Sequence, residues 1–244
     1  MGLKKFIKRN SFRLLYPLSK YYLSKERRYK YKDIHITVMP YVFHPGLFFS
    51  TKIILEYLEG KNLKGVSLLE LGAGTGIISI FCAKREAEVT ATDISSTAIK
   101  NIEQNSIINS VNINIIQSDL FAEIPEQKFE WIIINPPYYP RDPINEYEQA
   151  WFCGSKFQFF TQLFDQLGLY SDISSNITMI LSEDCDIKNI SRIAENKLFK
   201  LNEITRIRKW GEWNYLYKIV TIADNTKFGN SIMENDLQKT GKQY

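Results

Sequence analysis

Short apolar runs alternate with longer amphipathic stretches over most of the chain. The runs are rich in β-branched residues and are bounded by turn-forming residues, as buried strands are. They predict strands at 33–40, 66–71, 88–93, 111–119, 129–135 and 177–184. The amphipathic stretches predict helices at 50–60, 77–85, 95–109, 155–169 and 187–197. Alternating strands and helices indicate an α/β fold, with a mostly parallel sheet covered by helices on both faces.

The pattern changes towards the C-terminal end of the chain. Residues 200–210 and 213–224 are strand-like runs joined across Gly211 and Glu212, which predicts an antiparallel β-hairpin. The polar residues 225–244 are predicted to form a flexible tail. The chain of 244 residues is long enough to bury its own core, and we expect its main domain to span 33–224.

Composition narrows the class of protein. Hydrophobic residues make up 44% and charged residues 24%, close to the average for globular domains. The longest apolar stretch, 66–83, contains Glu70 and three glycines, so no transmembrane segment is expected. The three cysteines are scattered and the histidines number two, which predicts neither a disulfide framework nor a bound metal. Cysteines used in this way are typical of a cytoplasmic protein.

Positive charge is concentrated at the start of the chain. Residues 1–32 contain 11 basic residues and one acid, whereas the remainder contains 20 basic and 26 acidic residues. Tyrosines and phenylalanines lie between the basic residues. This composition is typical of a surface that meets RNA, the ribosome or an anionic membrane, and equally of a solvated helical segment. We interpret residues 1–32 as a short basic helical arm.

A glycine-rich loop lies between the strand at 66–71 and the helix that follows it. Glycines at 72, 74 and 76 allow tight turns and let a ligand approach the start of the helix closely. A dinucleotide-binding loop would place its third glycine where this chain has Ile77. A nucleotide-dependent oxidoreductase is therefore disfavoured.

The compact GxGxG pattern, preceded by Glu70, resembles the first motif of class I S-adenosylmethionine-dependent methyltransferases. The resemblance implies a Rossmann-like fold with a seven-stranded sheet and an antiparallel C-terminal hairpin. It also implies that S-adenosyl-L-methionine is the cofactor, bound by Glu70 and by the loop glycines Gly72, Gly74 and Gly76.

Two later strand ends extend the resemblance. Asp93 ends the second strand 21 residues after Gly72, where this family uses a carboxylate to bind the ribose hydroxyls. Asp119 ends the third strand and Leu120 follows it, where such enzymes often hold the adenine amine. Ligands of open α/β sheets lie beyond the carboxyl ends of the strands, and these residues lie there too.

The fourth strand ends in Asn135-Pro136-Pro137-Tyr138. This NPPY sequence resembles the motif of small-domain methyltransferases that act on planar nitrogens, including HemK/PrmC-like glutamine methyltransferases and adenine amino-methyltransferases. Such a nitrogen is a weak nucleophile with two N–H groups. The Asn135 side-chain oxygen and the Pro136 carbonyl can each accept one of them, and Tyr138 offers a flat face. The resemblance therefore implies that Asn135, Pro136 and Tyr138 are the catalytic residues.

The substrate stays open at this point. Residues 145–164 loosely resemble the segment after NPPY in the glutamine methyltransferases, whereas the basic arm and the spelling NPPYY favour an RNA base. His44, Phe48, Phe49 and Trp151 are candidates for the substrate mouth or for ordinary packing. The alternative function is a non-catalytic, cofactor-binding adaptor that docks on nucleic acid or the ribosome through the arm.

Overall fold

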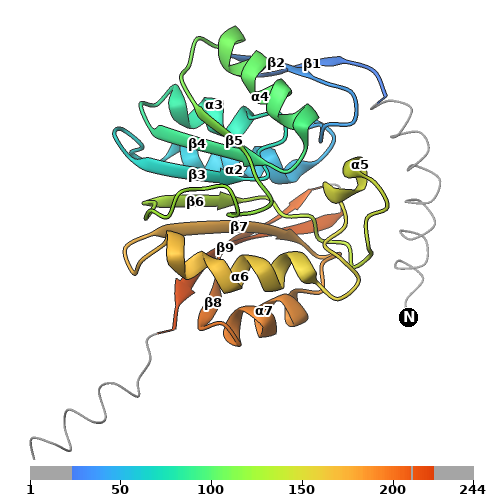
Figure 1. Ribbon diagram of the computed structural model, residues 1–244, viewed down its shortest axis with the longest axis vertical. Coiled ribbons are helices and arrows are strands. Elements are labelled where there is room, and N and C mark those ends of the chain that lie inside the picture. The colour runs from blue at the N-terminus through green and yellow to red at the C-terminus, as the bar shows by residue number, and fades with distance from the viewer. Residues whose placement is uncertain (1–23, 210, 223–244) are drawn as a thin grey trace, which may run out of the picture.

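The computed structural model describes residues 24–209 and 211–222 (Figure 1). The predictions made for 1–23 and for the tail 225–244 lie outside these residues. Nine strands are described: β1 Arg27–Tyr31, β2 Ile34–Val38, β3 Ser67–Leu71, β4 Glu88–Asp93, β5 Asn114–Gln117, β6 Trp131–Ile134, β7 Asn176–Ser182, β8 Phe199–Lys209 and β9 Glu212–Thr221. The described helices are α2 Phe49–Glu59, α3 Ile77–Ala83, α4 Ser96–Ile108, α5 Glu146–Gln149, α6 Gln158–Tyr170 and α7 Ile187–Glu195.

Seven strands form one sheet in the order β5-β4-β3-β6-β7-β9-β8. The first five of these strands pair in parallel, and β9 pairs antiparallel with both β7 and β8. The predicted α/β class, the seven-stranded sheet and the C-terminal hairpin are confirmed. The hairpin does not simply extend the sheet, because β9 inserts between β7 and β8.

Alternate residues of the central strands face two separate hydrophobic cores. Leu68 of β3 and Ile133 of β6 pack against α2, α3 and α4. Their neighbours Leu69 and Ile132 pack against α6 and α7 on the opposite face. Helices therefore cover both faces of the sheet, as Figure 1 shows. This double burial explains why the strands read as continuous apolar runs.

The first described strand corrects one prediction. Residues 27–31 belong to strand β1, which pairs antiparallel with β2, so the helical interpretation of this part of the basic arm is wrong. Tyr29 and Tyr31 alternate with exposed basic residues, and this period of two is that of a strand. The Tyr31 hydroxyl donates to Glu59 on α2 at 2.6 Å. The predicted boundary between 32 and 33 therefore falls in the turn of a hairpin that packs on the domain.

The described residues contain neither a membrane-spanning helix nor a cluster of metal ligands. No helix in 24–209 or 211–222 combines the length and the apolar character needed to cross a bilayer. Over the same ranges, no three His, Cys, Asp or Glu residues are grouped as a metal ion would require.

Candidate active site

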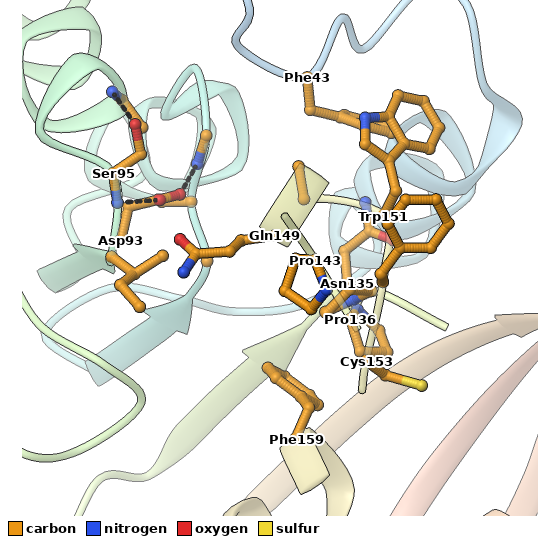
Figure 2. Close-up of a pocket in the computed structure, with 18 of the residues that line it drawn as sticks. Phe43, Asp93, Ser95, Asn135, Pro136, Pro143, Gln149, Trp151, Cys153 and Phe159 are labelled. Atoms are coloured by element: carbon orange, nitrogen blue, oxygen red, sulfur yellow. Dashed lines mark hydrogen bonds between the residues drawn. The ribbon is translucent and has the colours of Figure 1, made fainter. Parts of the chain in front are cut away.

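A cavity of about 320 Å³ opens at the carboxyl ends of β3, β4 and β6 (Figure 2). Nine of the ten predicted site residues line it: Glu70, Gly72, Gly74, Asp93, Asp119, Leu120, Asn135, Pro136 and Tyr138. The acidic residues of this lining are Glu70, Asp93, Asp119, Asp142 and Glu146. No lysine or arginine of the described residues belongs to the lining. The cavity therefore favours a ligand with positive charge over one that carries phosphates.

The glycine loop folds as its sequence predicts. Gly72, Gly74 and Gly76 have φ of 69°, 56° and 74°, in the left-handed region that glycine adopts without strain. Gly76 does not line the cavity and has a different task. A Cβ atom there would lie 3.0 Å from the Ile102 side chain, so this glycine lets the loop approach α4 closely.

Glu70 belongs to β3 and lies beneath the glycine loop, where it contacts the start of α3. Its carboxyl accepts hydrogen bonds from the backbone N–H of Ser79, at 2.8 Å, and from the Ser79 hydroxyl. The side chain is buried, and this burial raises its pKa from 4.5 to about 8. Glu70 therefore holds its proton more tightly than a surface carboxyl.

Asp93 joins the glycine loop to the start of α4. One carboxylate oxygen accepts from the Gly74 N–H at 2.9 Å, and the other accepts from the Ser95 N–H at 2.9 Å. Figure 2 shows both bonds at one wall of the cavity. Burial raises the Asp93 pKa. Each oxygen keeps a second acceptor position, so the carboxylate can hold the loop and still accept from a ligand hydroxyl.

The turn after β5 brings Asp119 and Leu120 to the same cavity. Leu120 has a left-handed φ of 50°, and its carbonyl accepts from the Ser118 hydroxyl at 3.0 Å. The same hydroxyl accepts from the Glu123 N–H at 3.0 Å. Ser118 thus fixes an irregular backbone turn whose strand is only four residues long, shorter than predicted.

The NPPY segment continues β6 without a cis peptide bond. Two backbone hydrogen bonds hold this segment against a later part of the chain. The Tyr139 N–H donates to the Trp151 carbonyl at 3.1 Å, and the Cys153 N–H donates to the Tyr139 carbonyl at 3.0 Å. Further along, Asp142 accepts from the Ser155 N–H at 2.8 Å. The rigid strand end is therefore fastened to residues 151–155.

The catalytic candidates differ in how they are held. Among the described residues, neither the Asn135 side chain nor the Pro136 carbonyl has a hydrogen-bond partner, so both acceptors face the cavity uncommitted. Tyr138 is more constrained. Its ring lies 4.8 Å from that of Tyr139, and burial together with the negative charges nearby raises its pKa. Tyr138 is thus a neutral, fixed wall of the cavity.

Several lining residues were not predicted from the sequence. Helix α5 places Gln149 at the cavity, and Figure 2 shows this side chain extending towards Asp93. Glu146 of the same helix accepts from the Ser96 N–H of α4 at 2.9 Å. A signal for α5 exists: Asn145 caps it, and Glu148 follows three residues later, as in a capping box.

The four aromatic candidates for the substrate mouth separate in the structure. Trp151 lines the cavity, whereas the lining contains none of His44, Phe48 and Phe49. Phe48 packs on Trp151 at a ring distance of 5.0 Å. His44 is buried beside Tyr29 with its ring edge-on, and its Nδ1 accepts from the Gly46 N–H. Phe43, which was not predicted, lines the cavity instead.

Solved structures place this architecture in a known class. The E. cuniculi Mtq2–Trm112 complex, responsible for methylation of the eRF1 translation termination factor, matches with a TM-score of 0.56 at 21% identity, covering 74% of this chain and 99% of that one. The T. thermophilus 16S rRNA N2 G1207 methyltransferase in complex with AdoMet and guanosine matches with a TM-score of 0.56 at 16% identity, covering 79% and 50%. The fold is that of class I methyltransferases.

Sequence comparison finds similarity to one family. Residues 34–150, just under half of the chain, match the family described as "Methyltransferase small domain". A relative from Methanocaldococcus jannaschii, named as a protein N5-glutamine methyltransferase, is 40% identical over 129 residues, which are 51% of this chain and 63% of the relative. The chain spans less than two thirds of the length of the first curated relatives it matches.

Proposed function

We propose that this protein is an S-adenosyl-L-methionine-dependent N-methyltransferase that acts on the side-chain amide of a protein glutamine. The observation that carries the proposal is the meeting of two features in one cavity. The glycine loop with Glu70 and Asp93 lies on one side, and the strand end with Asn135 and Pro136 lies on the other.

The cavity fits the proposed cofactor by charge and shape. S-adenosyl-L-methionine carries a sulfonium and an amino group, and the lining contains acidic residues but, among the described residues, no lysine or arginine. The pyrophosphate of a dinucleotide would meet the same carboxylates and be repelled. Glu70 and the loop backbone are placed to hold the methionine part, Asp93 the ribose, and Asp119 with Leu120 the adenine. When bound, the cofactor supplies an electrophilic methyl group on a positively charged sulfur.

The chain supplies position and hydrogen-bond acceptors. The Asn135 side-chain oxygen accepts one N–H of the substrate amide and the Pro136 carbonyl accepts the other, which aims the nitrogen lone pair at the methyl group. Both acceptors also stabilise the positive charge that develops on nitrogen as the bond to carbon forms. Tyr138, fixed against Tyr139, supports the flat face of the amide. The proton lost by the methylated nitrogen leaves to solvent.

The choice of protein over RNA has two supports. The M. jannaschii relative is named for glutamine methylation, and the E. cuniculi complex methylates a translation termination factor. The acidic lining also disfavours a substrate that brings phosphates to the cavity. The exocyclic amine of an RNA base remains the second candidate, because the T. thermophilus neighbour, a 16S rRNA methyltransferase of the same fold, was solved in complex with guanosine. The basic segment 1–32 is proposed to contact RNA, the ribosome or an anionic surface.

Methyl transfer from radiolabelled cofactor into a cell lysate that lacks this protein tests the proposal. We expect label that survives nuclease and is lost on protease digestion. Label that is removed by nuclease instead would show that the substrate is RNA and would contradict the choice of a protein glutamine. If no macromolecule is labelled while the protein binds the cofactor, the non-catalytic adaptor is the better account.

A further inference from the structure

Three asparagines, two in α4 and one at its C-cap, form hydrogen bonds with the backbone of β2 and of Met39, which follows it. Asn101, Asn105 and Asn109 are spaced by four residues and therefore share one face of the helix. The Asn109 amide both accepts from the His35 N–H, at 3.2 Å, and donates to the His35 carbonyl, at 2.7 Å. Such an amide gives β2 the pair of bonds that a neighbouring strand would give.

The two elements match in spacing. Four helical residues advance about 6 Å, and two strand residues advance about 6.6 Å, so every fourth helix position meets every second strand position. Asn105 accepts from the Thr37 N–H and donates to the Thr37 carbonyl, both at 2.8 Å. Asn101 accepts from the Met39 N–H at 3.0 Å and donates to the Thr37 carbonyl at 2.8 Å.

Asn105 makes one bond that the other two asparagines do not. Its second amide proton goes to the carbonyl of Thr75, at 2.9 Å. Thr75 lies between Gly74 and Gly76, is buried and lines the cavity. The Asn105 side chain is itself fully buried, at 0% exposure. It therefore connects strand β2 to the middle of the glycine loop without contact with solvent.

We propose that Asn105 is a positioning residue for the cofactor, which fixes the Thr75 carbonyl and with it the curvature of the glycine loop. Asp93 holds the loop from the cavity side through the Gly74 N–H. Asn105 holds it from the side of α4, where Gly76 already packs against Ile102. With both anchors the loop keeps its left-handed glycines, at the alternate positions 72, 74 and 76, in one arrangement before the cofactor arrives. This inference rests on the proposed cofactor site.

The test compares two buried asparagines of the same helix. Asn105→Ala removes the bonds to Thr37 and Thr75, whereas Asn101→Ala removes only bonds to β2. Both side chains are 0% exposed, so both variants leave buried backbone groups unpaired and both lower resistance to urea. Calorimetry with S-adenosylhomocysteine should give a Kd about tenfold higher for Asn105→Ala, and a Kd within about twofold of the unaltered protein for Asn101→Ala. In turnover, Asn105→Ala should raise KM for the cofactor and leave kcat nearly unchanged.

Each outcome has one meaning. Equal weakening of cofactor binding in both variants would contradict the inference, because the effect would then come from the docking of β2. Unchanged binding in Asn105→Ala would contradict it as well. If Asn105→Ala does not fold, Asn105→Ser replaces it, since the shorter side chain cannot donate to the Thr37 and Thr75 carbonyls together; the same rise in Kd is expected. Failure of the unaltered protein to bind S-adenosylhomocysteine would instead refute the proposed function.

Discussion

The two halves of the cavity are held in place by different means. On the cofactor half, buried or half-buried side chains fasten an irregular backbone: Glu70 binds the start of α3, Asp93 binds the Gly74 N–H, and Asn105 binds the Thr75 carbonyl. On the substrate half, prolines and backbone bonds to residues 151–153 fasten the strand end, and the Asn135 side chain stays uncommitted.

Under the proposed function, this difference follows from what each half binds. The cofactor half must keep the glycine loop in one shape. Its polar side chains therefore form hydrogen bonds with the loop and with the start of α3, and these bonds set the curvature of the loop before the cofactor binds. The substrate half must offer acceptors to an incoming amide, so its own side-chain acceptor cannot be used internally. Substitutions in the two halves should consequently separate binding of cofactor from methyl transfer.

The largest expected effect lies on the substrate half. Asn135→Ala removes one of the two acceptors that aim the substrate nitrogen, and we expect kcat to fall by about 100-fold to 1,000-fold. The Kd for S-adenosylhomocysteine should stay within about twofold, as measured by calorimetry. Loss of cofactor binding together with activity would mean that the NPPY segment is structural and that the two halves are not separable.

A smaller effect of the opposite kind is expected on the cofactor half. Asp93→Ala removes a carboxylate that holds the Gly74 and Ser95 N–H groups and that we propose accepts from the ribose. The Kd for S-adenosylhomocysteine should rise by about 10-fold to 100-fold, while kcat at saturating cofactor changes little. Asp93→Asn keeps one acceptor oxygen and should lie between Asp93→Ala and the unaltered protein. An unchanged Kd in Asp93→Ala would remove this residue from the site.

The last expected effect is of a different kind and concerns how stability depends on pH. Burial raises the Glu70 pKa from 4.5 to about 8 in the folded protein, so the neutral carboxyl favours the fold. Its contribution is complete below pH 4.5 and is lost as pH rises through about 8. Glu70→Gln stays neutral and keeps an acceptor for the Ser79 N–H. Relative to this variant, the unaltered protein should lose up to about 1.4 kcal/mol of unfolding free energy per pH unit between these values.

Urea unfolding of both proteins at pH 5, 7 and 9 measures this difference. Parallel stability curves would show that Glu70 is ionised in the free protein. The cofactor half would then carry a permanent negative charge beneath the glycine loop.

Sequence periodicity predicted most elements because the central strands are buried on both faces and stand out as apolar runs. The glycine loop with Glu70 and Asp93 was also predictable, since its residues lie within one strand–helix–strand unit. The strand at 27–31 was wrongly predicted as helix. The prediction relied on the number of basic residues and overlooked that tyrosines and basic residues alternate there with the period of a strand.

The substrate half was less accessible to prediction from sequence. Its rigidity comes from pairing between Tyr139 and Phe152, thirteen residues apart, and no local pattern specifies such a return of the chain. The four-residue helix α5 is too short to show helical periodicity, and only its capping residues mark it. The role of Asn105 likewise depends on a contact with Thr75, thirty residues away.

The central claim is that the cavity binds S-adenosyl-L-methionine and not a dinucleotide. Titration of the unaltered protein with S-adenosylhomocysteine and, separately, with NAD in a calorimeter tests it most directly. We predict saturable binding of one S-adenosylhomocysteine per chain and no measurable heat with NAD. Binding of NAD, or the absence of binding by S-adenosylhomocysteine, would contradict the account.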